Sequence, residues 1–277
     1  MTARSRQTFK QLITLPDLGI PLAEAALLMA CEEYPHLSLE PYLNQLDTMA
    51  ERVCARIGRG EAPVDKIEKI NDVLFREYGF RGNAANYFDP RNSFLNDVID
   101  RRLGIPITLS TIYLEVAGRL KVPIEGVGMP GHFVVKYRSG NHEIFLDPFN
   151  GGSVLTRNQC TRFLEHFAVR PGRNTELALR RVTNRQILAR MLDNLRMIYL
   201  KAETFDKALA MVEMMVLLEP DISTLRRDRG LLRLQVRQFP GAARDLRRYL
   251  EKLPAAADRE EIEKYLKEVE RIRATLN

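Results

Sequence analysis

A repeated spacing in the C-terminal third of the chain is the sequence feature that most restricts the fold. Leucines, phenylalanines, alanines and prolines all recur there at one and the same offset. The pairs are Leu200 and Leu234, Phe205 and Phe239, Ala208 and Ala242, and Pro220 and Pro254. Small alanines let two helices approach closely, and proline ends a helix because it lacks a backbone N–H donor. The spacing therefore predicts two helical hairpins in series.

The tetratricopeptide repeat, a helix-turn-helix unit with a period of about 34 residues, has this spacing and these residue types. Gly230 occupies the small position of the second repeat, whereas Arg196 stands at the equivalent place in the first. Two repeats leave apolar surface at both ends, so we expect the charged segment 259–276 to form a capping helix. We predict an all-α tail over residues 176–277, which a linker at 171–175 joins to a first domain over residues 1–170.

Eight arginines between Arg226 and Arg248 overlap the second repeat, and only Asp228 and Asp245 offset them. One interpretation of this window is a solvated helix face. Another is a surface for a protein or peptide partner of acidic character. Direct DNA contact is a weaker hypothesis, because aromatic residues are few there and no nucleic-acid motif is present. The candidate partner-binding residues are Arg226, Arg229, Arg233 and Arg237.

The hydrophobic period changes within the predicted first domain. Apolar residues recur at helical spacing up to about residue 120, and short β-branched or aromatic runs follow, separated by Gly, Ser, Asn and Pro. The last two of these runs predict a hairpin around Ser139, Gly140 and Asn141, and a capping box at Thr156 and Gln159 starts another helix. Helices, a small antiparallel sheet and further helices make an α+β domain. The earlier helices are predicted over 21–33, 39–57, 64–78, 93–102 and 106–120.

A polar loop, "GFRGNAANYFDPRN", interrupts the helices from Gly79 to Asn92. A long polar loop inside a compact domain is often functional. Several residues in and after it could line a cleft and bind a ligand, although Asn92 could instead cap a helix and Arg91 could pair with Asp89 or Asp97. The cleft candidates are Asn92, Asn96, Thr108, Ser110 and Arg91.

His132 and Asp147 are the candidate catalytic residues. His132 opens one predicted strand and Asp147 ends its hairpin partner, so the two side chains can meet. In thiol-dependent catalysis an imidazole takes the proton of the nucleophile and a carboxylate orients the ring. A structural His–Asp hydrogen bond that fixes two strands is the alternative.

Three segments around these residues carry a family resemblance: "DPRNSFLNDVIDRRLGIPITLSTIYLEVAGRL", "IEGVGMPGHFVVKY" and "FLDPFNGG". With "AALLMACEEYP" and "INDVLFREYGFRGN" they resemble the SirB-type bacterial family, over roughly Leu22 to Pro254. The resemblance implies a transglutaminase/papain-like domain followed by tetratricopeptide repeats. It also implies a triad in which a Cys opens the central helix, His132 matches the His and Asp147 matches the Asp.

The nucleophile of this triad is missing. The cysteine would fall at or beside Pro106, and no cysteine occurs between Cys54 and Cys160. Thr108 and Ser110 lie in the first turns of the same predicted helix, but such hydroxyls usually bond back to the backbone. Cys160 sits among apolar residues, where a thiol is usually inert. We therefore expect a degenerate triad.

Composition limits the remaining function classes. The three cysteines have no CxxC spacing and the four histidines have no metal-ligand spacing, so we expect reduced thiols, a cytoplasmic location, no metal and no cofactor. No apolar run approaches the roughly 20 residues that span a bilayer, and we expect no secretory signal.

Two hypotheses follow from these features. The first is a non-catalytic, transglutaminase-like protein that binds or regulates a partner through its degenerate cleft and its repeats. The alternative is a hydrolase or acyl transferase that uses His132 and Asp147 with a non-cysteine nucleophile or an activated water.

Overall fold

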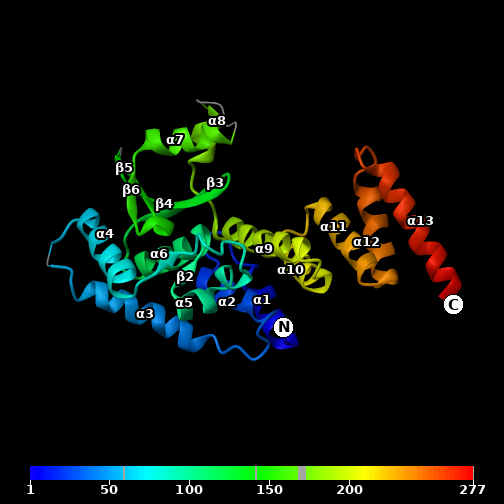
Figure 1. The fold of residues 1–277 in the computed structure, drawn as a ribbon, viewed down its shortest axis with the longest axis horizontal. Helices are drawn as coiled ribbons and strands as arrows, with labels where there is room; N and C mark the ends of the chain where they lie inside the picture. The colour runs from blue at the N-terminus through cyan, green and yellow to red at the C-terminus, as the bar shows by residue number, and fades with distance from the viewer. Residues whose placement is uncertain (59, 141, 168–172, 277) are drawn as a thin grey trace. The chain divides into compact units, whose positions relative to one another are not determined.

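The computed structural model describes residues 1–58, 60–140, 142–167 and 173–276. The chain divides into two compact units, Met1–Met191 and Leu192–Asn277, so the division falls within helix α9 (Asn184–Lys201) (Figure 1). Positions 171 and 172 of the predicted linker lie outside the described residues. Helix α8 begins at Arg173, and the boundary at 170–176 stays a prediction.

The first unit contains the helices that the apolar spacing predicts. The segment predicted at 64–78 is an α-helix that continues as a π-helix, and Gly79 follows it with a φ of +70°. The Thr156 hydroxyl accepts a hydrogen bond from the Gln159 backbone N–H, as the capping box predicts. The helices are α1 (Ala3–Leu12), α2 (Leu22–Ala30), α3 (Glu40–Cys54), α4 (Pro63–Asn71), η1 (Asp72–Glu77), α5 (Leu95–Arg101), α6 (Pro106–Arg119), α7 (Arg157–His166) and α8 (Arg173–Ala178).

Four antiparallel strands form the sheet of the first unit, in the order β3-β4-β5-β6. They are β3 (Ile124–Met129), β4 (His132–Ser139), β5 (His142–Asp147) and β6 (Ser153–Leu155). The predicted hairpin joins β4 to β5 through Gly140, which has a φ of +58°, and Asn141, which lies outside the described residues. The fold class is therefore α+β, as the sequence predicts.

A second, two-stranded ladder was not predicted from the sequence. Strands β1 (Arg81–Gly82) and β2 (Leu103–Gly104) pair in parallel and connect the polar loop to the residues just before α6. Strands this short leave no periodic signal. Two 3₁₀ turns also matter to the site, namely η2 (Pro90–Asn92) and η3 (Pro148–Asn150).

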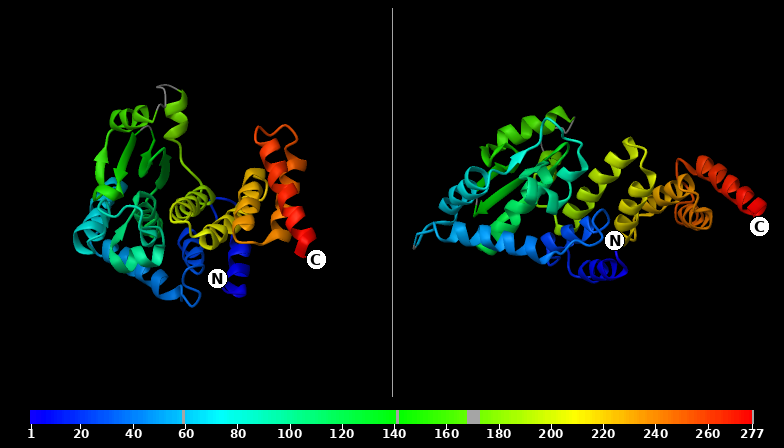
Figure 2. Two further views of the ribbon diagram at one scale, coloured as in Figure 1. Left: turned by 45° about the vertical axis from the view of Figure 1, so that its right-hand side comes forward. Right: turned by 60° about the horizontal axis from the view of Figure 1, so that its bottom comes forward.

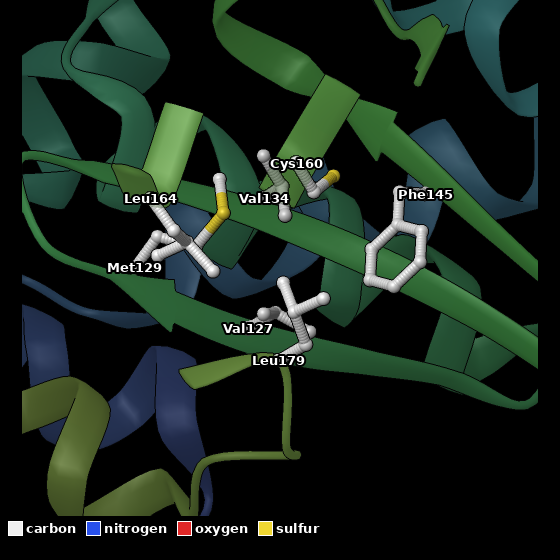
Figure 3. Packing of buried hydrophobic residues seen from close by; sticks show 7 residues of the cluster. All are labelled: Val127, Met129, Val134, Phe145, Cys160, Leu164 and Leu179. Carbon is white, nitrogen blue, oxygen red and sulfur yellow. The ribbon is translucent and has the colours of Figure 1, made fainter. Parts of the chain in front are cut away.

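Helices cover both faces of the four-stranded sheet. The largely apolar helix α6 packs against β3 and β4. On the other face, α7 and the end of α8 enclose a buried cluster with strands β3 to β5 (Figure 3). The cluster consists of Val127, Met129, Val134, Phe145, Cys160, Leu164 and Leu179. Because side chains alternate along a strand, His132 and Asp147 point to the same face as Val134 and Phe145.

The second unit repeats with the predicted period. Helices α10 (Phe205–Leu218) and α12 (Phe239–Lys252) each have 14 residues, and their first residues are the phenylalanine pair of the repeat. Ala208 and Ala242 are fully buried. A Cβ at Gly230 would lie 2.7 Å from Leu246, so this position needs a residue without a side chain.

The remaining helices of this unit continue the array. Helix α12 packs between α11 (Ser223–Gln235) and the last helix, α13 (Arg259–Leu276), and the three lie side by side in Figure 2. None of the helices in the described part of the chain is long and apolar enough to cross a lipid bilayer.

Candidate functional site

His132 and Asp147 lie in hydrogen-bond contact. The distance between His132 Nε2 and Asp147 Oδ2 is 2.8 Å, and the side chains are 13% and 5% exposed. His132 opens β4 and Asp147 ends β5, so the antiparallel pairing of these strands brings both residues to one end of the sheet. This pairing is the arrangement that the hairpin predicts from the sequence.

Four hydrogen bonds hold the Asp147 carboxylate. Its Oδ1 accepts the backbone N–H groups of Phe149 and Asn150, and its Oδ2 accepts the Asn150 side-chain amide as well as His132. Burial raises the pKa of Asp147, but the hydrogen bonds and charge of His132 and the bonds from Asn150 outweigh it and lower the pKa below its ordinary value. Asp147 is therefore ionised near neutral pH. An ionised carboxylate only accepts hydrogen bonds, so His132 Nε2 carries a proton, and Nδ1 is an acceptor in the neutral form of the ring.

Asn150 is the residue that sequence reasoning missed. Its amide donates to the same Asp147 oxygen that binds the imidazole, at 2.8 Å. The signal was present in "FLDPFNGG", because an Asp before Pro often caps a short turn with a polar residue three positions on. Asn150 fixes the carboxylate, and the carboxylate fixes the imidazole.

No nucleophile is hydrogen-bonded to His132 among the described residues. Pro106 occupies the first position of α6, where the resemblance places the cysteine. The Thr108 hydroxyl donates to the backbone carbonyl of Asn92 and accepts the Ile105 backbone N–H instead. The Ser110 hydroxyl is fully buried and makes no hydrogen bond within the described part of the chain.

The raised pKa values of the two buried thiols oppose a nucleophilic role for them. Burial and the charge of Asp147 raise the pKa of Cys160 to about 11, and burial raises the pKa of Cys31. A thiol that stays protonated is a poor nucleophile. Cys54 is exposed on α3. No group of three or more His, Cys, Asp or Glu side chains in the described segments could hold a metal ion.

Two of the other cleft candidates brace the polar loop. The Asn92 amide donates to the backbone carbonyls of Asn86 and Tyr87, while the Asn92 backbone carbonyl accepts the Thr108 hydroxyl. Asn92 and Thr108 thus join the loop to the first turn of α6, and they are fully buried. No hydrogen bond connects them to His132 in the described residues.

Arg91 and Asn96 have different surroundings. Arg91 pairs with Asp89, which is one of the two alternatives that the sequence left open. Asp89 also accepts Arg101, and both arginines oppose burial to lower the pKa of Asp89. Asn96 is buried on α5, and its side-chain carbonyl has no hydrogen-bond partner in the described part of the chain.

The arginine window of the second repeat is largely neutralised within its own unit. Arg229 forms two bonds to the buried carboxylate of Asp245, at 2.6 and 2.7 Å, and Arg233 bridges Asp245 and Glu213. In contrast, Arg226 donates to the carbonyl of Pro220 and Arg237 is exposed. Arg226 and Arg237 form no ion pair among the described residues.

A groove of about 480 Å³ lies on the second unit. It runs between α9, α11 and α13, and its floor is apolar. Arg196 and Arg227 also line the groove, and both form ion pairs with Asp228. The apolar lining residues are Leu200, Phe205, Leu231, Leu232, Leu234 and Tyr265.

The fold and the His–Asp pair define a transglutaminase-like domain followed by helical repeats, and comparison with known proteins agrees. Residues 40–193 match the transglutaminase-like superfamily and residues 195–267 match the tetratricopeptide repeat. The chain belongs to the transglutaminase-like superfamily. The predicted architecture is thereby confirmed, whereas the SirB-type name stays a prediction.

Its relatives include bacterial and human proteins. A UPF0162 protein of Xylella fastidiosa strain Temecula1 is 36% identical over 250 residues, which are 89% of each chain. A UPF0162 protein of Vibrio cholerae is 29% identical over 68% of this chain and 70% of its own length. F-box only protein 21 of Homo sapiens is 29% identical over 60% of this chain and 30% of its own length. No solved structure matches the chain.

Proposed function

We propose that this chain is a non-catalytic, transglutaminase-like protein that binds a protein partner through the groove of its repeats. The groove between α9, α11 and α13 is the observation that carries the proposal. Apolar floors with charged edges suit the burial of a partner's apolar side chain, which is the main source of binding energy at such surfaces. The absence of a nucleophile beside His132 in the described residues supports the non-catalytic part.

The partner is acidic in this proposal, and Arg226 and Arg237 are the residues that would meet its carboxylates. Arg229 and Arg233 stabilise the repeat itself, because their charges are already paired with Asp245. Three free cysteines are in keeping with a reducing cytoplasm. A regulatory role would then act through binding of this partner.

A displayed library of random peptides, screened against the whole chain, tests the proposal. We expect it to yield acidic peptides with an apolar anchor. The variant Leu200→Glu should weaken them at least tenfold, because it places a charge in the apolar floor. Leu253→Glu is the matched control, since Leu253 is 38% exposed in the same unit and does not line the groove. Equal binding to both variants, with both shown to be folded by circular dichroism, would remove the groove from the proposal.

A hydrolase or acyl transferase is the second candidate, and the orientation of His132 is the observation that favours it. An imidazole with Nδ1 free to accept a proton is arranged as a general base. The test measures ammonia release from a glutamine peptide and ester hydrolysis by the whole chain. A rate above background that His132→Ala abolishes would establish this candidate, and we expect no such rate.

A further inference from the structure

Six aromatic side chains form one continuous line of ring contacts through the candidate site. Each ring contacts the next, with centroid distances between 5.3 and 6.3 Å. The line comes from the polar loop, the turn after β5, strand β4 and helix α7 with its C-terminal residue. We call it the aromatic strip, and its members in order are Phe88, Tyr87, Phe149, His132, Phe163 and Phe167.

Two glycines make room for the rings of the strip. A Cβ at Gly82 would lie 2.6 Å from the Phe149 ring, and a Cβ at Gly131 would lie 2.3 Å from the Phe167 ring. Gly131 also has a φ of +70°, which side chains rarely adopt. The rings therefore rest directly on backbone, and their positions are set by the ladder β1–β2 and by the turn before β4.

The strip lies partly at the surface. Phe88 is 62% exposed, Phe167 is 44% exposed and Tyr87 is 36% exposed. These three are the exposed phenylalanine and tyrosine side chains of the described residues, and all belong to one line. A contiguous exposed apolar feature of this kind marks an interaction site, because scattered single residues would need no explanation.

Few hydrogen-bonding groups lie along the strip, and the Tyr87 hydroxyl is one of them. The Tyr87 hydroxyl makes no hydrogen bond with another residue in the described part of the chain. Burial raises the pKa of Tyr87, against a smaller opposing effect of the Arg190 charge, so this hydroxyl keeps its proton. Arg190 itself donates to the backbone carbonyl of His132 at 2.9 Å and so brings a cation beside the strip. The acceptors among these side chains are the Tyr87 hydroxyl oxygen and, in the neutral imidazole, His132 Nδ1.

We propose that the aromatic strip binds an extended, proline-containing peptide segment. A polyproline II helix has no internal hydrogen bonds, so its carbonyl groups are free to accept from donors such as the Tyr87 hydroxyl. Proline also lacks a backbone N–H donor, so a proline-rich segment needs few acceptors from the strip. Stiff proline rings lose little conformational entropy when they stack on aromatic faces.

Two other occupants fit these groups less well. The carbonyls of an α-helix are engaged in its own hydrogen bonds and could not accept from Tyr87. An ammonium group favours aromatic faces, but the guanidinium of Arg190 would repel it, and the Asp147 carboxylate is already saturated by four hydrogen bonds. The strip lies in the first unit, so this inference does not depend on the repeat groove.

Fluorescein-labelled decaproline, titrated with the whole chain and followed by fluorescence anisotropy, tests the proposal. We expect saturable binding at least tenfold tighter than that of a Gly-Ser peptide or a lysine-containing peptide of equal length. Phe88→Ala and Phe167→Ala should each weaken decaproline at least fivefold. Tyr87→Phe keeps the ring and removes the donor, and it should weaken binding about threefold to tenfold. Leu18→Ala is the control, since Leu18 is half exposed in the same unit and outside the strip.

Each contrary result would overturn one part of the proposal. Decaproline that binds no better than the Gly-Ser peptide, or equally well to Phe88→Ala and wild type, rejects the strip as a proline site. Tighter binding of the lysine peptide assigns the strip to a cation instead. Leu200→Glu should leave decaproline binding unchanged, so failure of the repeat groove and failure of the strip are seen separately.

Discussion

The candidate site of the first unit and the arginine window of the second unit differ in how far their polar groups are paired within the fold. In the first unit, four hydrogen bonds converge on Asp147, yet they leave His132 Nδ1 unbonded among the described residues beside exposed rings. In the second unit, Arg229 and Arg233 form ion pairs with carboxylates from neighbouring helices. A cluster of charged residues in a sequence therefore does not show that their side chains are available to bind another molecule. What matters is whether a partner lies within reach in the same fold.

The largest expected effect concerns the buried carboxylate that neutralises the window. Asp245 is 3% exposed and bonds both Arg229 and Arg233. Asp245→Asn should lower the free energy of unfolding by about 3–5 kcal/mol, because it leaves the largely buried Arg229 without an anion and Arg233 with Glu213 alone. Urea denaturation followed by circular dichroism measures this change.

A surface pair in the same unit provides the control. Arg247 and Glu270 are both 44% exposed, so Glu270→Gln should cost less than about 1 kcal/mol. If the two variants lose equal stability, the arginines of the window are not held by Asp245, and the contrast between the two units disappears.

The second effect tests how the first unit keeps its aromatic strip in place. Gly131 and Gly140 both have a left-handed φ, at +70° and +58°, but a Cβ at Gly140 would meet nothing within 4 Å. Gly140→Ala should therefore cost only the conformational penalty of about 1 kcal/mol. Gly131→Ala adds a collision with Phe167 and should cost about 2–3 kcal/mol in all. Thermal unfolding of the two variants measures their losses of stability. Equal losses would mean that Phe167 does not rest on Gly131.

The third effect is the pH dependence that Asp147 contributes. Its pKa is lowered in the folded state, so the stabilisation is present above the ordinary pKa near 3.8 and is lost as the pH falls through the folded value. Asp147→Asn should cost about 1–3 kcal/mol at pH 7. The difference between variant and wild type should shrink as the pH drops from 4 to 2. A difference that stays constant across that range would show that the carboxylate charge does not stabilise the fold.

The sequence predicts the second unit more completely than the first, and the reason is physical. Repeat helices contact their neighbours at a fixed separation, so the period alone places the starts of α10 and α12. The contacts of the first unit join residues far apart, such as Thr108 with Asn92 and Gly82 with Phe149. A local sequence pattern could predict only the contact between His132 and Asp147, because a hairpin joins their two strands. The short ladder β1–β2, the role of Asn150 and the aromatic strip depend on the folded chain.

Charge pairing could not be predicted in either unit. The arginine window carries a formal excess in the sequence, and helical spacing does not say which carboxylate faces which arginine. Asp245 follows Arg233 closely in the sequence, yet the two meet because α11 and α12 pack against each other. Arg91 and Asp89 are the exception, since only one residue separates them and a turn can join their side chains.

The smallest expected effect tests whether the two repeats are equivalent in energy as well as in geometry. Glu203 and Arg237 occupy equivalent positions of the two repeats, each in the turn just before a helix, with φ values of +54° and +59°. Glycine at either position should relieve left-handed strain and raise the free energy of unfolding by about 0.5–1 kcal/mol. Arg248→Gly, at an exposed position in the interior of α12, should instead lower it by about 1 kcal/mol. Equal gains for Glu203→Gly and Arg237→Gly in urea denaturation would show that the turns store the same strain. Unequal gains would mean that the surroundings of each turn, and not the period, set its energy.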